Sequence, residues 1–100
     1  MNMHQRKLVT VVTEAFALEP LLAMLREEGA LGVTHFRVQG AGAHGVRAGD
    51  IEEYGNVQVE VVVGAEVALR ILTRLERDFF PRFAMIVHES DVRVLRSDKF

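Results

Sequence analysis

Residues 56–63, NVQVEVVV, alternate apolar and polar side chains along most of their length. A period of two is the repeat of a β-strand, in which successive side chains point to opposite faces of a sheet. The pattern therefore predicts a strand with a face made of Val57, Val59, Val61 and Val63. Gln58, Glu60 and Val62 would lie on its other face.

Four further segments are predicted to be extended. Residues 7–13, KLVTVVT, are β-branched and almost continuously apolar, which is typical of a strand in the centre of a sheet. Residues 33–38, VTHFRV, alternate and predict a less buried strand. Near the end of the chain, residues 84–87 and 92–95 form two short apolar pieces separated by polar residues.

Two segments have helical spacing instead. Pro20 can occupy the first turn of a helix whose leucines, Leu18, Leu21, Leu22 and Leu25, recur at helical intervals. Residues 65–79 repeat apolar side chains about every 3.6 residues, and Pro81 ends that helix. Glu66 and Arg70 are expected to form an i,i+4 ion pair on its exposed face.

The resulting order is β-α-β-β-α-β with a short extra C-terminal strand, in one α+β domain spanning residues 1–100. This is the ferredoxin-like arrangement, in which both helices pack on one face of an antiparallel sheet. The other face needs a cover, and a neighbouring subunit is the expected one.

Composition excludes several classes of function. A net charge of −2 gives no basic excess for general nucleic-acid binding. The absence of cysteine excludes disulfides, a thiolate nucleophile and cysteine-based zinc sites, and the four histidines show no metal-binding spacing. The apolar run near the N-terminus, residues 8–12, is too short for a signal peptide or a membrane span, so a cytoplasmic protein is expected.

Residues 40–55 form a long, glycine-rich connection that contains a literal G-x-G-x-x-G. In a dinucleotide fold this motif leads into a helix, whereas here it leads into the strand at residues 56–63, so that interpretation fails. Glycines at 40, 42 and 45 could still adopt positive φ and form a backbone nest for a phosphate, with Arg47 and His44 as donors. A flexible connection without a ligand explains the composition equally well.

Taken together, four fragments resemble the PII signal-transduction family, and especially its PII-like branch linked to bicarbonate transporters and carboxysomes. They are KLVTVVTEAF, EEGALGVTHFRVQGAG, the spacing from Gly40 and Gly42 to Val46 and Arg47, and GNVQVEVVV. The resemblance runs from about residue 7 to residue 96. It implies a homotrimer with nucleotides in the clefts between subunits, a T-loop at about residues 40–55 and a B-loop at 81–84.

The resemblance also implies site residues. At the base of the T-loop, Gly40, Gly42 and Arg47 would contact phosphate, and His44 stands where members of the branch often have a basic residue. Ligand binding would reorder this loop and change its surface for a partner protein.

Other parts of the implied cleft come from the strands. Val12 and Thr13 would lie near the base and ribose of the nucleotide. His88, Glu89 and Ser90 would line the same cleft.

Arg93 and Arg96 are implied as further phosphate partners. Arg82 is the one charge of the B-loop segment FPRFAM, which favours ADP, AMP or cyclic AMP over ATP. Tyr54 lies near the exit of the T-loop, so regulatory nucleotidylation of this tyrosine is not expected. The cysteine-free C-terminus resembles the carboxysome-associated type, which implies bicarbonate as co-ligand and a bicarbonate transporter or carboxysome-related protein as partner.

Neither catalysis nor a cofactor is expected. An acylphosphatase-like hydrolase of this fold would need an arginine-bearing phosphate loop after the first strand, where this chain reads TEAFALE. A small-molecule regulatory module of the ACT type shares the element order and remains the alternative, although it would not need a sixteen-residue glycine-rich loop with Arg47.

Overall fold

The computed structural model of the protein describes residues 1–42, 45–46, 55–96 and 98. Its main strands are β1 (His4–Glu14), β2 (Val33–Val38), β5 (Asn56–Val63) and β6 (Met85–Val94). Its helices are α1 (Leu18–Glu27) and α2 (Ala65–Arg74), with a 3-10 turn, Ala15–Ala17, before α1 and a π-helical turn, Leu75–Phe79, after α2. Two short strands, β3 (Ala41–Gly42) and β4 (Gly45–Val46), pair with each other within the segment between β2 and β5.

The four main strands form one antiparallel sheet in the order β2-β5-β1-β6. β1 lies between β5 and β6 and pairs with both, from Lys7 opposite Val63 to Glu14 opposite Asn56 on one side, and from His4 opposite Val94 to Thr13 opposite Met85 on the other. The predicted α+β, ferredoxin-like order of strands and helices is confirmed.

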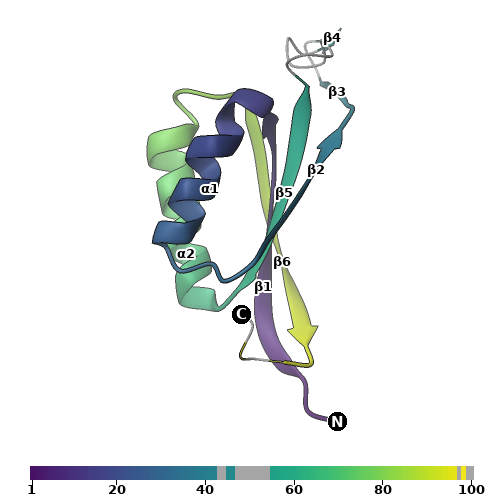
Figure 1. Ribbon diagram of the computed structural model, residues 1–100, viewed down its shortest axis with the longest axis vertical. Helices are drawn as coiled ribbons and strands as arrows, with labels where there is room; N and C mark the ends of the chain where they lie inside the picture. Colours follow the sequence, from purple (N-terminus) through teal and green to yellow (C-terminus); the bar gives the residue numbers. More distant parts are fainter. Residues whose placement is uncertain (43–44, 47–54, 97, 99–100) are drawn as a thin grey trace.

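Both helices cover the same face of the sheet, as Figure 1 shows. The period of two in β5 has the predicted result, because all four of its odd-numbered valines are buried beneath the helices. They meet β1 and the apolar stripes of α1 and α2 in a single core. Its largest fully buried apolar side chains are Leu21, Leu25, Ile71, Leu75, Val9, Val11 and Val59.

The predicted extra C-terminal strand is wrong, because residues 85–94 form the single strand β6. The polar run from His88 to Asp91, which suggested a break, pairs with Thr10 to Lys7 of β1. β6 is an edge strand with mostly exposed or half-buried side chains, so polar residues cost little there and the backbone pairing continues.

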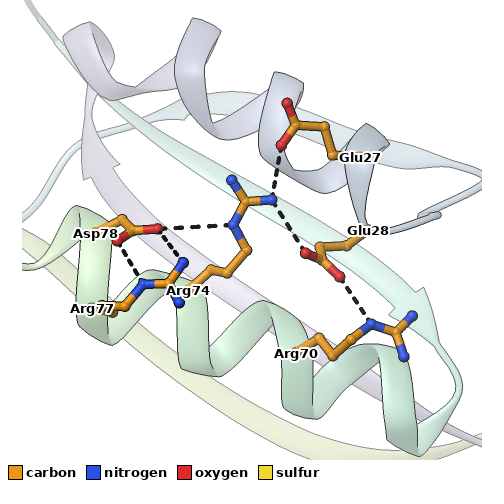
Figure 2. A network of polar contacts seen from close by, with 6 residues as sticks. All are labelled: Glu27, Glu28, Arg70, Arg74, Arg77 and Asp78. Atoms are coloured by element: carbon orange, nitrogen blue, oxygen red, sulfur yellow. Dashed lines mark hydrogen bonds and ion pairs between the residues drawn. The ribbon is translucent and has the colours of Figure 1, made fainter.

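The predicted ion pair between Glu66 and Arg70 is also wrong. Arg70 Nε donates instead to Glu28 Oε1 at the end of α1, at 2.9 Å. Figure 2 shows that Arg74 joins the same network through Nη1, which lies 2.8 Å from Glu27 Oε1 and 3.2 Å from Glu28 Oε2. A pair within one helix would leave both side chains in solvent, whereas these contacts connect the two helices.

Removing side-chain volume from the core should destabilise the protein strongly. Ile71 is 0% exposed, so Ile71→Ala is expected to lower the free energy of unfolding by about 2–5 kcal/mol in urea denaturation at fixed protein concentration. Leu69 lies two residues earlier on α2 and is 66% exposed, so Leu69→Ala is the matched control, with an expected loss within about 0.5 kcal/mol. Equal losses for the two variants would contradict the packing described for α2.

Candidate functional site

The base of the segment between β2 and β5 lies at one end of the sheet, where β1 ends and β6 begins (Figure 1). The backbone N–H of Ala15 donates to the carbonyl of Gly55 at 2.9 Å, which fixes the turn after β1 against the exit of this segment. Gly40 and Gly42 lie at its entry, Gly42 in the β3–β4 hairpin. His44 and Arg47 lie outside the described residues.

Two of the glycines at this base can be compared with the positive φ that a backbone nest would use. Within the described residues, Gly29 at the end of α1 is the residue with positive φ, at 90°. Gly40 is exposed, and a Cβ added there would meet nothing within 4 Å. Gly40 therefore does not use the positive φ that a glycine allows, and Gly42 and Gly45 pair with each other as strand residues of the β3–β4 hairpin.

Val12 and Thr13, at the end of β1, face opposite sides of the sheet. Val12 is half-buried on the face without helices, between Gln58 of β5 and Ile86 of β6. Thr13 is 0% exposed on the helix face, where its Oγ1 donates to the carbonyl of Ala84 at 2.8 Å. Thr13 therefore holds the start of β6 in place, and its hydroxyl does not share a surface with Val12.

The three consecutive candidates on β6 alternate in the same way. His88 and Ser90 are exposed on the face of the sheet without helices, opposite Thr10 and Leu8 of β1. Glu89 lies on the helix face, with its carboxylate 3.5 Å from Lys7 Nζ.

On the helix face, Lys7 forms ion pairs with two carboxylates of β6. Its Nζ lies 3.5 Å from Glu89 and donates to Asp91 Oδ1 at 2.5 Å. The hydrogen bond with Asp91 is the largest cause that raises the pKa of Lys7, so the ammonium stays charged at neutral pH. Glu89 is therefore an ion-pair partner of Lys7 in this chain and does not join His88.

Arg93 and Arg96 lie at the opposite end of the molecule from the loop base. Arg93 is opposite Gln5 in the register, and Arg96 Nη2 lies 3.3 Å from Asp98 Oδ2. The pairings from Thr13 to His4 cover nine residue steps, or about 30 Å of strand. Within one chain, these arginines and the loop base cannot contact the same small ligand.

The face of the sheet without helices contains a largely apolar surface, here called the open face. Phe36 on β2 and Ile86 on β6 are 43% and 51% exposed there. The register places them in one row across the four strands, with Gln58 and Val12 between them. Leu8, Val62, Val92 and Val94 extend this surface toward the termini.

Sequence reasoning missed the polar centre of the open face. Glu60 and Thr10 lie side by side there, Thr10 only 4% exposed, and Gln58 Nε2 donates to Glu60 Oε2 at 3.0 Å. The period of two places Gln58 and Glu60 opposite the valines, but only the register shows that Gln58 lies beside Val12 and that Thr10 lies between Glu60 and His88.

Among the residues that the structure describes, neither a metal centre nor a membrane-spanning segment is found. Across residues 1–42, 45–46, 55–96 and 98, no three His, Asp or Glu side chains gather in a way that could hold a metal ion. In the same described part of the chain, no helix combines the length and the hydropathy needed to cross a membrane.

Comparisons with known proteins show which family and which solved structures this architecture is similar to. The family model described as Nitrogen regulatory protein P-II matches residues 6–99. A PII-like signalling protein of Thermus thermophilus is 35% identical, with a TM-score of 0.84 over 99% of this chain and 98% of the other. No curated protein matches the sequence significantly.

Two more distant structures share the fold. CPII of Thiomonas intermedia K12, a nitrogen regulatory PII-like protein solved with ADP, AMP and bicarbonate, is 23% identical, with a TM-score of 0.89 over 99% of this chain and 96% of its own. The Bacillus subtilis GlnK–ATP complex is 21% identical, with a TM-score of 0.53 over 86% of this chain and 82% of its own. From the family match and the 35% identical relative, we conclude that the chain belongs to the P-II family of nitrogen regulatory proteins.

Proposed function

We propose that this protein is a non-enzymatic PII-like regulator that binds ADP or AMP, together with bicarbonate, in clefts between the subunits of a homotrimer. One observation supports the shared cleft: the loop base with Gly40 lies at one end of the sheet and Arg93 lies at the other, and the β1–β6 pairing between these ends covers nine residue steps. Nine steps correspond to about 30 Å of strand. A single ligand can therefore contact both the loop base and Arg93 only if these come from different copies of the chain.

The open face supports such an assembly. It exposes large apolar side chains, including Phe36 and Ile86, on the side of the sheet that the helices leave bare. Monomeric proteins rarely leave a contiguous surface of this kind in water. Three copies packed through this face would bury it and bring the loop base of one copy toward the arginines of the next.

The ligands are supported by relatives and by the residues present. CPII has been solved with ADP and bicarbonate, and with ADP, AMP and bicarbonate. In this chain, Arg47 would pair with a phosphate or with bicarbonate, because a guanidinium matches planar and tetrahedral oxyanions. Arg82 is the one cation between the π-turn and β6, and its Cζ lies 5.0 Å from the centre of the Phe83 ring. A single charge there favours ADP or AMP over ATP.

The T-loop would be the part of the protein that transmits ligand binding to a partner. Ligand-dependent ordering of residues 40–55 would change the surface offered to a downstream protein, for which a bicarbonate transporter or a carboxysome-related protein is the proposed class. The protein would act in the cytoplasm or in association with carboxysomes. One binding site would then respond both to the energy state of the cell and to inorganic carbon.

Nucleotide binding can be measured by calorimetric titration with AMP, ADP, ATP and cyclic AMP, each with and without bicarbonate. We expect AMP or ADP to bind more tightly than ATP, and bicarbonate to change the affinity. Arg47→Ala should weaken binding by about 10- to 100-fold, because it removes a charge-assisted hydrogen bond to phosphate.

Arg26→Ala is the matched control for this titration, because Arg26 is an exposed arginine in the last turn of α1. Its affinity should equal that of the unmodified protein. Unchanged affinity in Arg47→Ala would remove Arg47 from the site, and no binding of any nucleotide would contradict the proposed function.

Assembly through the open face can be tested separately. Phe36→Asp places a charge on that face and should convert the trimer to monomers at micromolar concentration in analytical ultracentrifugation. Leu31→Asp introduces the same charge at a position that is 69% exposed and lies beside α1 and β2, so it should remain trimeric. A Phe36→Asp protein with the unmodified sedimentation coefficient would show that the open face is not the interface.

A further inference from the structure

The last residue of β1, Glu14, places a carboxylate at the loop base. Its backbone is extended, with φ −67° and ψ 146°, so the alternation of the strand continues through it. The odd-numbered residues of β1 from Val9 onward are buried beneath the helices. Glu14 therefore shares the open face with Val12, two residues or about 7 Å away along the strand. It is half-buried there.

The elements that meet at the loop base lie on both sides of this carboxylate. In the register, Glu14 is opposite Asn56 of β5, which in turn is opposite Val38 at the end of β2. On the other side, Glu14 Oε2 accepts a hydrogen bond from the backbone N–H of Ala84, the residue before β6, at 3.3 Å. Glu14 therefore lies beside the exit of the T-loop on one side and the end of the B-loop on the other.

The negative charge of Glu14 is not balanced within the described part of the chain. None of the ion pairs among the described residues involves this carboxylate. Arg82, the cation of the B-loop, lies with its Cζ 5.0 Å from the centre of the Phe83 ring. It lines a groove of the helix layer together with Glu27 and Asp78. The hydrogen bond from the Ala84 N–H is long and leaves further acceptor sites on the carboxylate.

This charge lies on the path that the proposed function gives to the phosphates of a nucleotide. With the base and ribose near Val12, the phosphate chain extends along the open face toward Gly40. It then passes the row of the sheet that contains Val38, Asn56 and Glu14. Like charges repel, and more strongly at a partly buried position than in open water. Each added phosphate should therefore be opposed more strongly by Glu14.

We propose that Glu14 determines which adenine nucleotide the site accepts, because its carboxylate repels the third phosphate of ATP. The inference rests on the proposed function and adds a residue that acts by repulsion. A single B-loop cation, Arg82, limits the attraction for ATP, whereas Glu14 disfavours ATP directly. A residue that discriminates by repulsion does not have to contact the ligands that are accepted. Glu14 is therefore a specificity residue and not a part of the ADP or AMP contacts.

A graded series at position 14 tests this inference by calorimetric titration with AMP, ADP and ATP. Glu14→Gln removes the charge and keeps an oxygen that can accept from Ala84, and Glu14→Lys reverses the charge. The ratio of the ATP to the ADP dissociation constant should fall at least about fivefold in Glu14→Gln, and further in Glu14→Lys. The affinity of Glu14→Gln for AMP should change by about twofold or less. The change in the ratio should shrink as salt is added.

Glu19→Gln is the matched control, because it removes the same charge from an exposed residue in the first turn of α1, on the helix side of the sheet. Its dissociation constants for all three nucleotides should equal those of the unmodified protein. Urea denaturation of Glu14→Gln reports whether the hydrogen bond to Ala84 matters for folding. Its midpoint should be unchanged, because that bond is long and exposed.

An unchanged ratio in both position-14 variants, while ADP still binds, would overturn the inference. An equal loss of affinity for AMP, ADP and ATP would also overturn it, because Glu14 would then contact the ribose that all three share. An equal change of the ratio in Glu19→Gln would show an effect of net charge alone, with the same consequence. If the unmodified protein binds no nucleotide at all, the proposed function itself fails and this inference fails with it, which is a different result from the other three.

Discussion

The pairing of β1 with β5 on one side and β6 on the other determines the rest of this structure. It aligns the odd-numbered valines of β1 and β5 on one face, where α1 and α2 bury them. The same register sends Val12, Phe36 and Ile86 to the opposite face, where nothing within the described part of the chain covers them. A slip of one residue would exchange the two faces, so core formation and the open face are consequences of one set of backbone hydrogen bonds.

This register also governs how the family's function can arise in this chain. It places the T-loop base beside the end of β1 and carries Arg93 to the far end of β6, beside Gln5. Under the proposed function, one chain would therefore hold two parts of a nucleotide site that it cannot combine by itself. Assembly through the open face would bury apolar surface and complete the site in the same step, which gives the subunit contacts a direct role in ligand binding.

Sequence patterns predicted the elements better than their contacts. The period of two in β5 and the helical periodicity of α2 are strong because each repeats a buried face, and both were confirmed. The run from His88 to Asp91 appeared to break a strand, because an edge strand tolerates polar side chains and leaves no apolar periodicity. Local spacing paired Arg70 with Glu66, whereas the packing of α2 against α1 brings Glu28 closer. The opposite orientations of Val12 and Thr13 follow from the strand period alone, whereas the separation of Arg93 from Gly40 follows from register and topology, which no single fragment encodes.

The central claim is that each nucleotide site is shared between two copies, and subunit complementation tests it most directly. Arg47→Ala and Arg93→Ala are prepared separately, shown to be trimeric and nucleotide-binding deficient, then unfolded together in equal amounts and refolded. Random assembly of shared sites should restore full affinity in about a quarter of the clefts, which calorimetry would report as stoichiometry. If the mixture shows no more high-affinity binding than the two variants alone, each site is not built from Arg47 of one copy and Arg93 of the next, and the account is contradicted.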